Sequence, residues 1–178
     1  MLEQMRNRLE GARTFEAAID TLLRDVIALH GAEFGNVQLP IGTNFVIVAQ
    51  QGLSAAFLKA FRTVDKDQGC ACGRVIRLGI PVMVADVNKD KEYVKFRADA
   101  KAAGYRAVQS SPLQTRDGAM IGIVSTLFAN VHEPSPIEME TLRRYSGVAS
   151  EYLRQLLGDE KLTHRAVKMN RALYAGLV

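Results

Sequence analysis

The chain has 178 residues, a length that suits one domain with appended segments. It is 48% hydrophobic and 24% charged, as in ordinary globular proteins, and no apolar run approaches the roughly 20 residues that a membrane span requires. The formal net charge of +4 comes from scattered basic residues, which argues against a nucleic-acid partner. Two cysteines and a charged start unlike a secretory signal predict a reducing, cytoplasmic compartment, with no membrane partner.

The first 50 residues predict helix followed by a strand pair. Apolar residues recur at intervals of three and four over 2–30, which indicates one kinked helix or two consecutive helices. Thr14 is placed to cap the second part, and Gly31 is placed to end it. Two strands follow over 34–40 and 44–50, with a turn between them.

The middle of the chain predicts short elements. One short helix is capped by Ser54, and another spans 73–78. A brief apolar strand covers 81–85. The segment 91–103 then predicts a charged helix with Val94 among its inward-facing residues.

The stretch 105–128 predicts a central hairpin. Two apolar runs flank Asp117-Gly118, a pair that favours a two-residue type I′ turn. Such a turn places Ser110 opposite Ser125, and both strand faces then carry apolar side chains, as in a pair covered on both sides. Pro112 lacks an N–H for the ladder, so we expect a bulge or a break there.

The last 45 residues predict two helices. Residues 135–138 (SPIE) form a capping box with proline at the first helical position, which opens a long helix. Gly158 interrupts the apolar repeat, which resumes over 160–175. The order of elements along the chain indicates an α+β sandwich around a mainly antiparallel sheet.

Apolar stripes on the terminal helices predict a partner. The stripes lie on segments 2–12, 142–156 and 162–173, and they extend beyond what one sheet face needs. We therefore expect a homodimer formed by these helices, because isolated helices of this length are marginal in water. The alternative is that the helix ends fray or pack on their own chain.

Several motifs are similar to a known family. They are FGNVQL at 34–39, CGR at 72–74, PVMVADV at 81–87, GYRAVQSSPL at 104–113, DG at 117–118 and IGIVS at 121–125. With these motifs, residues 15–157 resemble the GAF domain, a small-molecule-binding and signalling module common in bacterial sensor proteins.

The resemblance implies a GAF-like antiparallel sheet in the order 2-1-5-4-3, counting the five predicted strands along the chain. The N- and C-terminal helices would cover one face, and short helices and loops would roof a ligand pocket on the other. We expect this domain to span 1–158, including the N-terminal helix 2–30. A C-terminal helical extension would follow over 159–178.

Small polar residues on the buried hairpin either bond to one another in the core or line a polar pocket. Arg106 could bind a carboxylate or phosphate, or pair with a helix carboxylate such as Asp99 or Glu92. Asp86 suits a turn or a helix cap, with a place in the pocket as the second option. The candidate ligand-binding residues are Gln38, Cys72, Asp86, Arg106, Gln109, Ser110, Ser111 and Ser125.

The two cysteines, Cys70 and Cys72, do not predict a metal site, since a zinc site needs four ligands and the three histidines stand singly. Some GAF relatives reduce free methionine sulfoxide with a set of cysteines, but this chain lacks their third, separated cysteine. The simplest interpretation of Cys72 is a small buried side chain at the start of a helix. The sequence assigns no catalytic residue and no metal, and it leaves any cofactor unknown.

We therefore expect a non-catalytic sensor or regulatory domain that binds an unidentified small molecule and dimerises through its terminal helices. Its output would lie in a separate signalling protein. Two alternatives remain open: a small redox enzyme that uses Cys70 or Cys72, and a ligand-free dimerisation module with a collapsed pocket.

Overall fold

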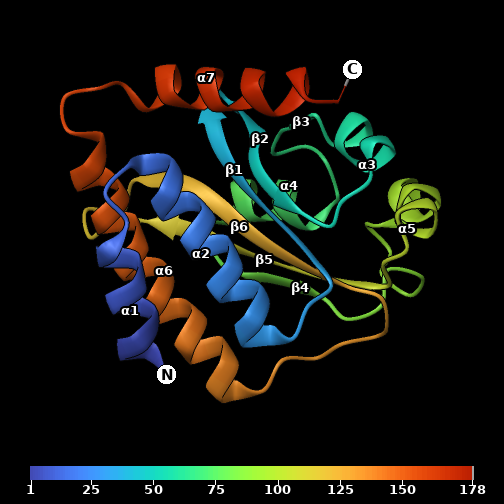
Figure 1. Cartoon of the computed structure of the whole chain (residues 1–178). Helices are drawn as coiled ribbons and strands as arrows, with labels where there is room; N and C mark the ends of the chain where they lie inside the picture. The colour runs from blue at the N-terminus through green and yellow to red at the C-terminus, as the bar shows by residue number, and fades with distance from the viewer. Residues whose placement is uncertain (178) are drawn as a thin grey trace.

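The computed structural model describes residues 1–177 and shows one antiparallel sheet with helices on both faces (Figure 1). The strands are β1 (Phe34–Ile41), β2 (Asn44–Gln51), β3 (Thr63–Val64), β4 (Val82–Val84), β5 (Ala107–Gln114) and β6 (Met120–Phe128). The helices are α1 (Leu2–Gly11), α2 (Phe15–His30), α3 (Ala55–Ala60), α4 (Ala71–Leu78), the 3-10 helix η1 (Val94–Phe96), α5 (Arg97–Ala103), α6 (Pro136–Leu157) and α7 (Leu162–Ala175).

The sheet has the order β3-β2-β1-β6-β5-β4. The five strands predicted from the sequence appear in the expected order, which confirms the α+β fold. The structure has one strand more than predicted. This is β3, a two-residue strand that pairs with Phe45 and Val46 at the free edge of β2.

The central hairpin has the predicted register but a different tip. Ser110 lies opposite Ser125, and Pro112 keeps its place opposite Ile123, so the expected break at the proline is wrong. The register shifts only after Leu113, and five residues join β5 to β6 in place of two. The Thr115 backbone holds this longer loop, since its N–H donates to the Ala119 carbonyl at 3.0 Å and its carbonyl accepts the Gly118 N–H at 2.9 Å.

The helix ends follow the sequence signals. The Thr14 hydroxyl accepts the Ala17 N–H at 3.2 Å, so α1 and α2 are two helices separated just before this cap. Gly31 ends α2 in the left-handed conformation, with φ of 59°. The capping box at the start of α6 is present, with the Ser135 N–H donating to the Glu138 carboxylate at 2.7 Å.

The terminal helices bury their apolar stripes against their own chain. Met5 and Leu9 of α1 pack into one cluster with Leu142 and Leu153 of α6, beneath which lies the sheet. Helix α7 crosses the β1–β2 end of the sheet and buries Met169 there (Figure 1). The stripes are therefore accounted for within one chain, and the reason for expecting a dimer does not hold.

The segment predicted as one helix over 91–103 is instead η1 followed by α5. The Asp90 carboxylate accepts the N–H groups of both Glu92 and Tyr93 at 3.0 Å, and these bonds form a turn that delays the helix. Tyr93 consequently points into the core, whereas Val94 is 55% exposed and not inward-facing as expected.

None of the helices within residues 1–177 combines the length and the apolar character needed to cross a membrane.

Candidate functional site

A row of small polar side chains crosses the middle of the sheet beneath α4. Asn36, Ser125 and Ser110 are cross-strand partners on β1, β6 and β5, and they share one face. The hydroxyls of Ser110 and Ser125 are 2.8 Å apart. The Cys72 Sγ lies 3.4 Å from the Ser110 hydroxyl and 3.3 Å from the Ser125 hydroxyl, so α4 closes the row from above.

The start of α4 lies close to the backbone of two neighbouring loops, because glycines at 69 and 73 leave room. A Cβ at Gly73 would lie 2.1 Å from the Gln68 carbonyl oxygen, and a Cβ at Gly69 would lie 2.4 Å from that of Glu92. Both glycines are therefore required for this approach. Their positions fix the first turn of α4 and, with it, the place of Cys72 over the serines.

A cavity of about 20 Å³ lies between this polar row and the helices above it; we call it the α4 cavity. Asn36, Gln38, Cys72 and Ser125 are among the residues that line it. The volume matches a single water-sized molecule and is far below the roughly 300 Å³ at the lower end of ligand pockets. The pocket expected from the family resemblance is thus nearly filled by side chains.

Two buried acceptor atoms at the floor of the α4 cavity lack partners. The Asn36 Oδ1 and the Gln38 Oε1 accept no hydrogen bond from any of residues 1–177. Buried polar atoms are normally paired, because desolvation without a hydrogen bond is unfavourable. The floor can therefore accept hydrogen bonds from a molecule that supplies donors.

An aromatic layer forms the roof of the α4 cavity. Phe57 and Phe61 stack with ring centroids 4.6 Å apart, and the Phe57 ring meets the edge of Tyr105 at 5.8 Å. The hydroxyls of Tyr93 and Tyr105 lie 3.0 Å apart. Burial raises the pKa of both tyrosines, so both phenols are neutral hydrogen-bonding groups at physiological pH.

The two cysteines are free thiols in buried positions. Burial raises the pKa of Cys70 to about 12 and also raises the pKa of Cys72, although the Ser110 and Ser125 hydroxyls oppose this shift. Both groups are therefore protonated at neutral pH, and the thiolate needed for nucleophilic redox chemistry is disfavoured.

Asp86 and Arg106 form an ion pair at the edge of the sheet. The Arg106 Nε and Nη2 donate to the two Asp86 oxygens at 2.7 and 3.0 Å, and this contact lowers the pKa of Asp86. The Asp86 carboxylate also accepts the Asn88 N–H at 3.0 Å, which confirms its role in a turn. Of the two uses considered for Arg106, the pairing with a helix carboxylate such as Asp99 or Glu92 is wrong, because the carboxylate that it binds is that of Asp86.

Gln109 and Ser111 lie on the opposite face of the sheet, because side chains alternate along β5. The Gln109 Nε2 contacts the Met139 Sδ at 3.3 Å under α6. The structure therefore divides the candidate residues: Gln38, Cys72, Ser110 and Ser125 lie together beneath α4, and the other four do not.

The candidate residues did not include Asn36, Phe57, Phe61 and Tyr93, which line the α4 cavity, or Tyr105, whose hydroxyl contacts that of Tyr93. Asn36 could have been found from strand alternation, since it shares a face with Gln38 two residues later. No sequence signal identifies the two tyrosines. Their hydroxyls come within hydrogen-bonding distance only because the turn at Asp90 directs Tyr93 into the core.

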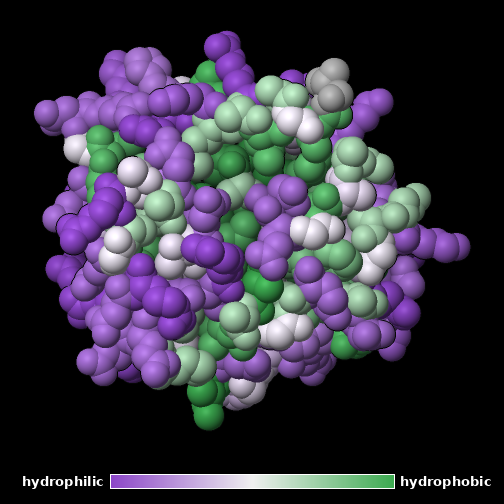
Figure 2. Space-filling model, in the orientation of Figure 1, coloured by the Kyte–Doolittle hydropathy of each residue, from purple (hydrophilic) through white to green (hydrophobic). Residues whose placement is uncertain are grey.

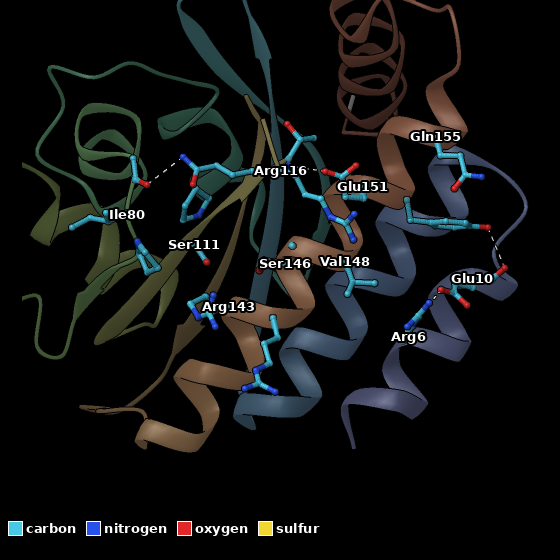
Figure 3. A pocket seen from close by; sticks show the side chains of 18 residues that line it. Arg6, Glu10, Ile80, Ser111, Arg116, Arg143, Ser146, Val148, Glu151 and Gln155 are labelled. Atoms are coloured by element: carbon cyan, nitrogen blue, oxygen red, sulfur yellow. Dashed lines mark hydrogen bonds and ion pairs between the residues drawn. The ribbon is translucent and has the colours of Figure 1, made fainter. Parts of the chain in front are cut away.

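A larger hollow of about 680 Å³ crosses α6 on the opposite face; we call it the α6 trough. Figure 3 shows Ile80 at one end and Arg6 and Glu10 at the other, with Ser146 and Val148 of α6 between them. Its lining also includes Ser111, Arg116, Arg143, Arg144, Gly147 and Glu151.

Within residues 1–177, no three His, Cys, Asp or Glu side chains gather in a way that could hold a metal ion.

Comparisons with known proteins show which family shares this fold. A family model described as "GAF domain" matches residues 12–154. The GAF domain of a phosphoenolpyruvate-protein phosphotransferase from Coxiella burnetii is 17% identical with a TM-score of 0.73, covering 86% of this chain and 90% of that chain. A GAF domain/HD domain protein from Geobacter sulfurreducens is 22% identical with a TM-score of 0.68, covering 84% and 97%.

A third solved structure, the free methionine-R-sulfoxide reductase from Neisseria meningitidis in complex with its substrate, is 16% identical with a TM-score of 0.71. The alignment covers 93% of this chain and 89% of that chain. At these identities the likeness concerns the fold. No curated protein matches the chain.

Proposed function

This chain belongs to the GAF domain family, and from that premise we propose that it is a regulatory sensor domain that binds a small molecule beneath α4. The single observation that carries this proposal is the pair of unpartnered acceptors, Asn36 Oδ1 and Gln38 Oε1, at the floor of the α4 cavity. A ligand with hydrogen-bond donors would satisfy both atoms, and the neighbouring Ser110 and Ser125 hydroxyls could donate or accept.

Binding requires the roof to move, because the α4 cavity is too small for an organic ligand. The moving parts would be α4 and the aromatic side chains of Phe57, Phe61 and Tyr93. Such a site is closed without ligand, and the ligand selects the open form.

Occupancy of the site could reach the other face of the sheet through β6. Ser125 faces the α4 cavity, whereas its neighbour Thr126 contacts the His30 ring of α2 at 3.3 Å on the opposite side. A shift of β6 would therefore alter the packing of α2, which lies against α6. The output would then lie in a separate signalling protein.

A homodimer through the terminal helices stays a prediction. Because the apolar stripes are internal, a dimer would have to use the outer surfaces of α1 and α6, where Figure 2 shows mainly hydrophilic residues. Contacts of this kind weaken as salt screens them. Light scattering at low and high salt tests this expectation, and a monomer at every concentration in low salt would contradict it.

The sensor proposal is tested by native mass spectrometry of protein taken directly from cells, together with a thermal-shift screen of small polar compounds. We expect a retained or stabilising molecule, because a ligand that binds only the folded state raises its stability. Asn36→Ala should abolish this effect by removing an acceptor. Ser111→Ala, on the opposite face, should preserve it.

The proposal is contradicted if no compound is retained or stabilises the protein, or if Asn36→Ala binds as tightly as the unmodified chain. Turnover of free methionine sulfoxide that is lost in Cys72→Ser would favour the reductase alternative instead.

A further inference from the structure

The α6 trough lies on the face of the sheet opposite the α4 cavity, so a site there is independent of the proposed sensor pocket. Its volume of about 680 Å³ falls within the 300–1,000 Å³ typical of small-molecule sites. The hollow runs between the loop at Ile80 and α6 and continues across α6 toward Arg6 (Figure 3).

Arginines outnumber carboxylates in the lining of the α6 trough. Four arginines line it, against two glutamates. Both glutamates are already engaged. The Glu10 carboxylate accepts from the Arg6 Nε at 2.7 Å, and the Glu151 carboxylate accepts the Arg116 backbone N–H and the Arg154 guanidinium, each at 2.6 Å.

The positive charge of the remaining arginines is only partly balanced. Arg143 and Arg144 share one carboxylate, that of Glu140, at 2.8 and 2.6 Å. The Arg116 guanidinium forms no ion pair with any carboxylate of residues 1–177. The Nε and Nη2 of Arg143 are both occupied by the Glu140 carboxylate at 2.8 Å, which leaves its Nη1 as a donor. The trough therefore presents the unpaired Arg116 guanidinium, which can bind an anion in the bidentate manner, and one remaining donor group of Arg143.

The floor of the α6 trough consists of small residues of β5 and α6. The Ser146 hydroxyl is buried and has no hydrogen-bond partner among residues 1–177, and Ser111 faces it from β5. A Cβ added at Gly147 would meet no atom within 4 Å. Glycine is less favourable than alanine inside a helix, and no neighbour here requires it. Its effect is to leave the trough open where it crosses α6.

We infer that the α6 trough binds a small organic anion that carries phosphate or carboxylate groups. The anionic group would be held by Arg116 and Arg143, and the unpartnered Ser146 hydroxyl would add a hydrogen bond at the floor. Ile80 and Val148 supply apolar contacts for the body of the ligand. The phosphate and carboxylate classes share this recognition chemistry, and the test separates them.

The test is an NMR titration of the ¹⁵N-labelled full chain with pyrophosphate in one arm and citrate in the other. Sodium chloride keeps the ionic strength constant, so general screening is held fixed. We expect saturable shifts of amides in 111–116 and 143–151, with α4 unaffected. The arm with the lower dissociation constant identifies the class of anion.

Two variants localise the binding. Replacing both arginines, Arg116→Gln with Arg143→Gln, should weaken the better probe at least tenfold. Arg24→Gln, which removes an exposed charge from α2, should leave the affinity unchanged. Gly147→Leu should block the trough and abolish binding, whereas Asn36→Ala should not, because Asn36 lies in the other pocket.

The inference is overturned if neither probe gives saturable shifts, if the shifts cluster on α4, or if the double variant binds as tightly as the unmodified chain. These results concern the α6 face alone. A failure here leaves the sensor proposal standing, and a failure of the sensor proposal leaves saturable binding at 111–116 and 143–151 intact.

Discussion

The two faces of the sheet differ in the polar groups that they bury and in the empty volume that they leave. Beneath α4, a polar floor is sealed by aromatic side chains and leaves a cavity of only about 20 Å³. Beneath α6, small residues of β5 and α6, among them Ser111, Ser146 and Gly147, leave a trough of about 680 Å³ open to solvent. The face with the buried polar row is therefore not the face with the large hollow. One face holds hydrogen-bonding groups without space, and the other holds space with charge at its rim.

The largest effect is expected from Leu9→Ala, which tests whether α1 belongs to the domain core. Leu9 is 0% exposed between α1 and α6, so its truncation should lower the free energy of unfolding by about 2–5 kcal/mol. Urea unfolding measures this change. Leu78→Ala, at a side chain that is 52% exposed, is the control and should change stability by less than about 0.5 kcal/mol.

If Leu9→Ala leaves the stability of the monomer unchanged, α1 is an appended helix and the α6 face is not the core described above.

The next effect concerns pH and His30, which lies on the α6 side of the sheet. Burial lowers its pKa from 6.5 to about 4; the nearby Glu138 carboxylate opposes this shift, and His132 adds to it. Between these pH values the unfolded chain binds more protons than the folded one. Stability should therefore fall as the pH drops from 6.5 toward 4, by at most about 3 kcal/mol.

His30→Gln should remove this part of the pH dependence, because glutamine does not titrate. Urea unfolding at pH 7, 5.5 and 4.5 gives the comparison. An identical slope in the variant and the unmodified chain would show that other groups cause the loss of stability.

The smallest effect is expected from the polar row beneath α4. Ser125→Ala removes the shared partner of the Ser110 hydroxyl and the Cys72 thiol, and should destabilise the fold by about 1 kcal/mol. Adding Ser110→Ala should cost less than the sum of the two single changes, since no unpaired hydroxyl then remains. A double-mutant cycle by urea unfolding measures this coupling. Full additivity would mean that the two hydroxyls do not interact.

The register of the central hairpin could be predicted because it depends on local signals, whereas the strand order was implied only by the family resemblance. The alternation along β5 and β6, with a turn at Asp117-Gly118, sets Ser110 opposite Ser125. The loop itself could not be predicted, because the Thr115 hydroxyl bonds the Asp117 carboxylate and the Ala119 carbonyl and so favours a longer connection.

The site was predicted only in part, because its residues meet through tertiary contacts. Neighbours in sequence such as Ser110 and Ser111 face opposite layers: Ser110 contacts Ser125 beside the α4 cavity, and Ser111 lines the α6 trough. The trough gave no sequence signal, since Arg116 and Arg143 come to line the same hollow only after α6 packs across β5. The internal packing of the last helix could not be predicted either, since α7 returns to β1 and β2 and buries Met169 there only in the folded chain.

Ligand binding beneath α4 requires the roof over the polar floor to open locally. Thiol labelling of Cys72 in the Cys70→Ser variant tests it most directly, because Cys72 reacts only when α4 lifts. We expect labelling to proceed through a local opening of α4. The free energy of this opening should be smaller than that of global unfolding, and low urea should not change it. Labelling that follows the urea dependence of global unfolding would contradict it.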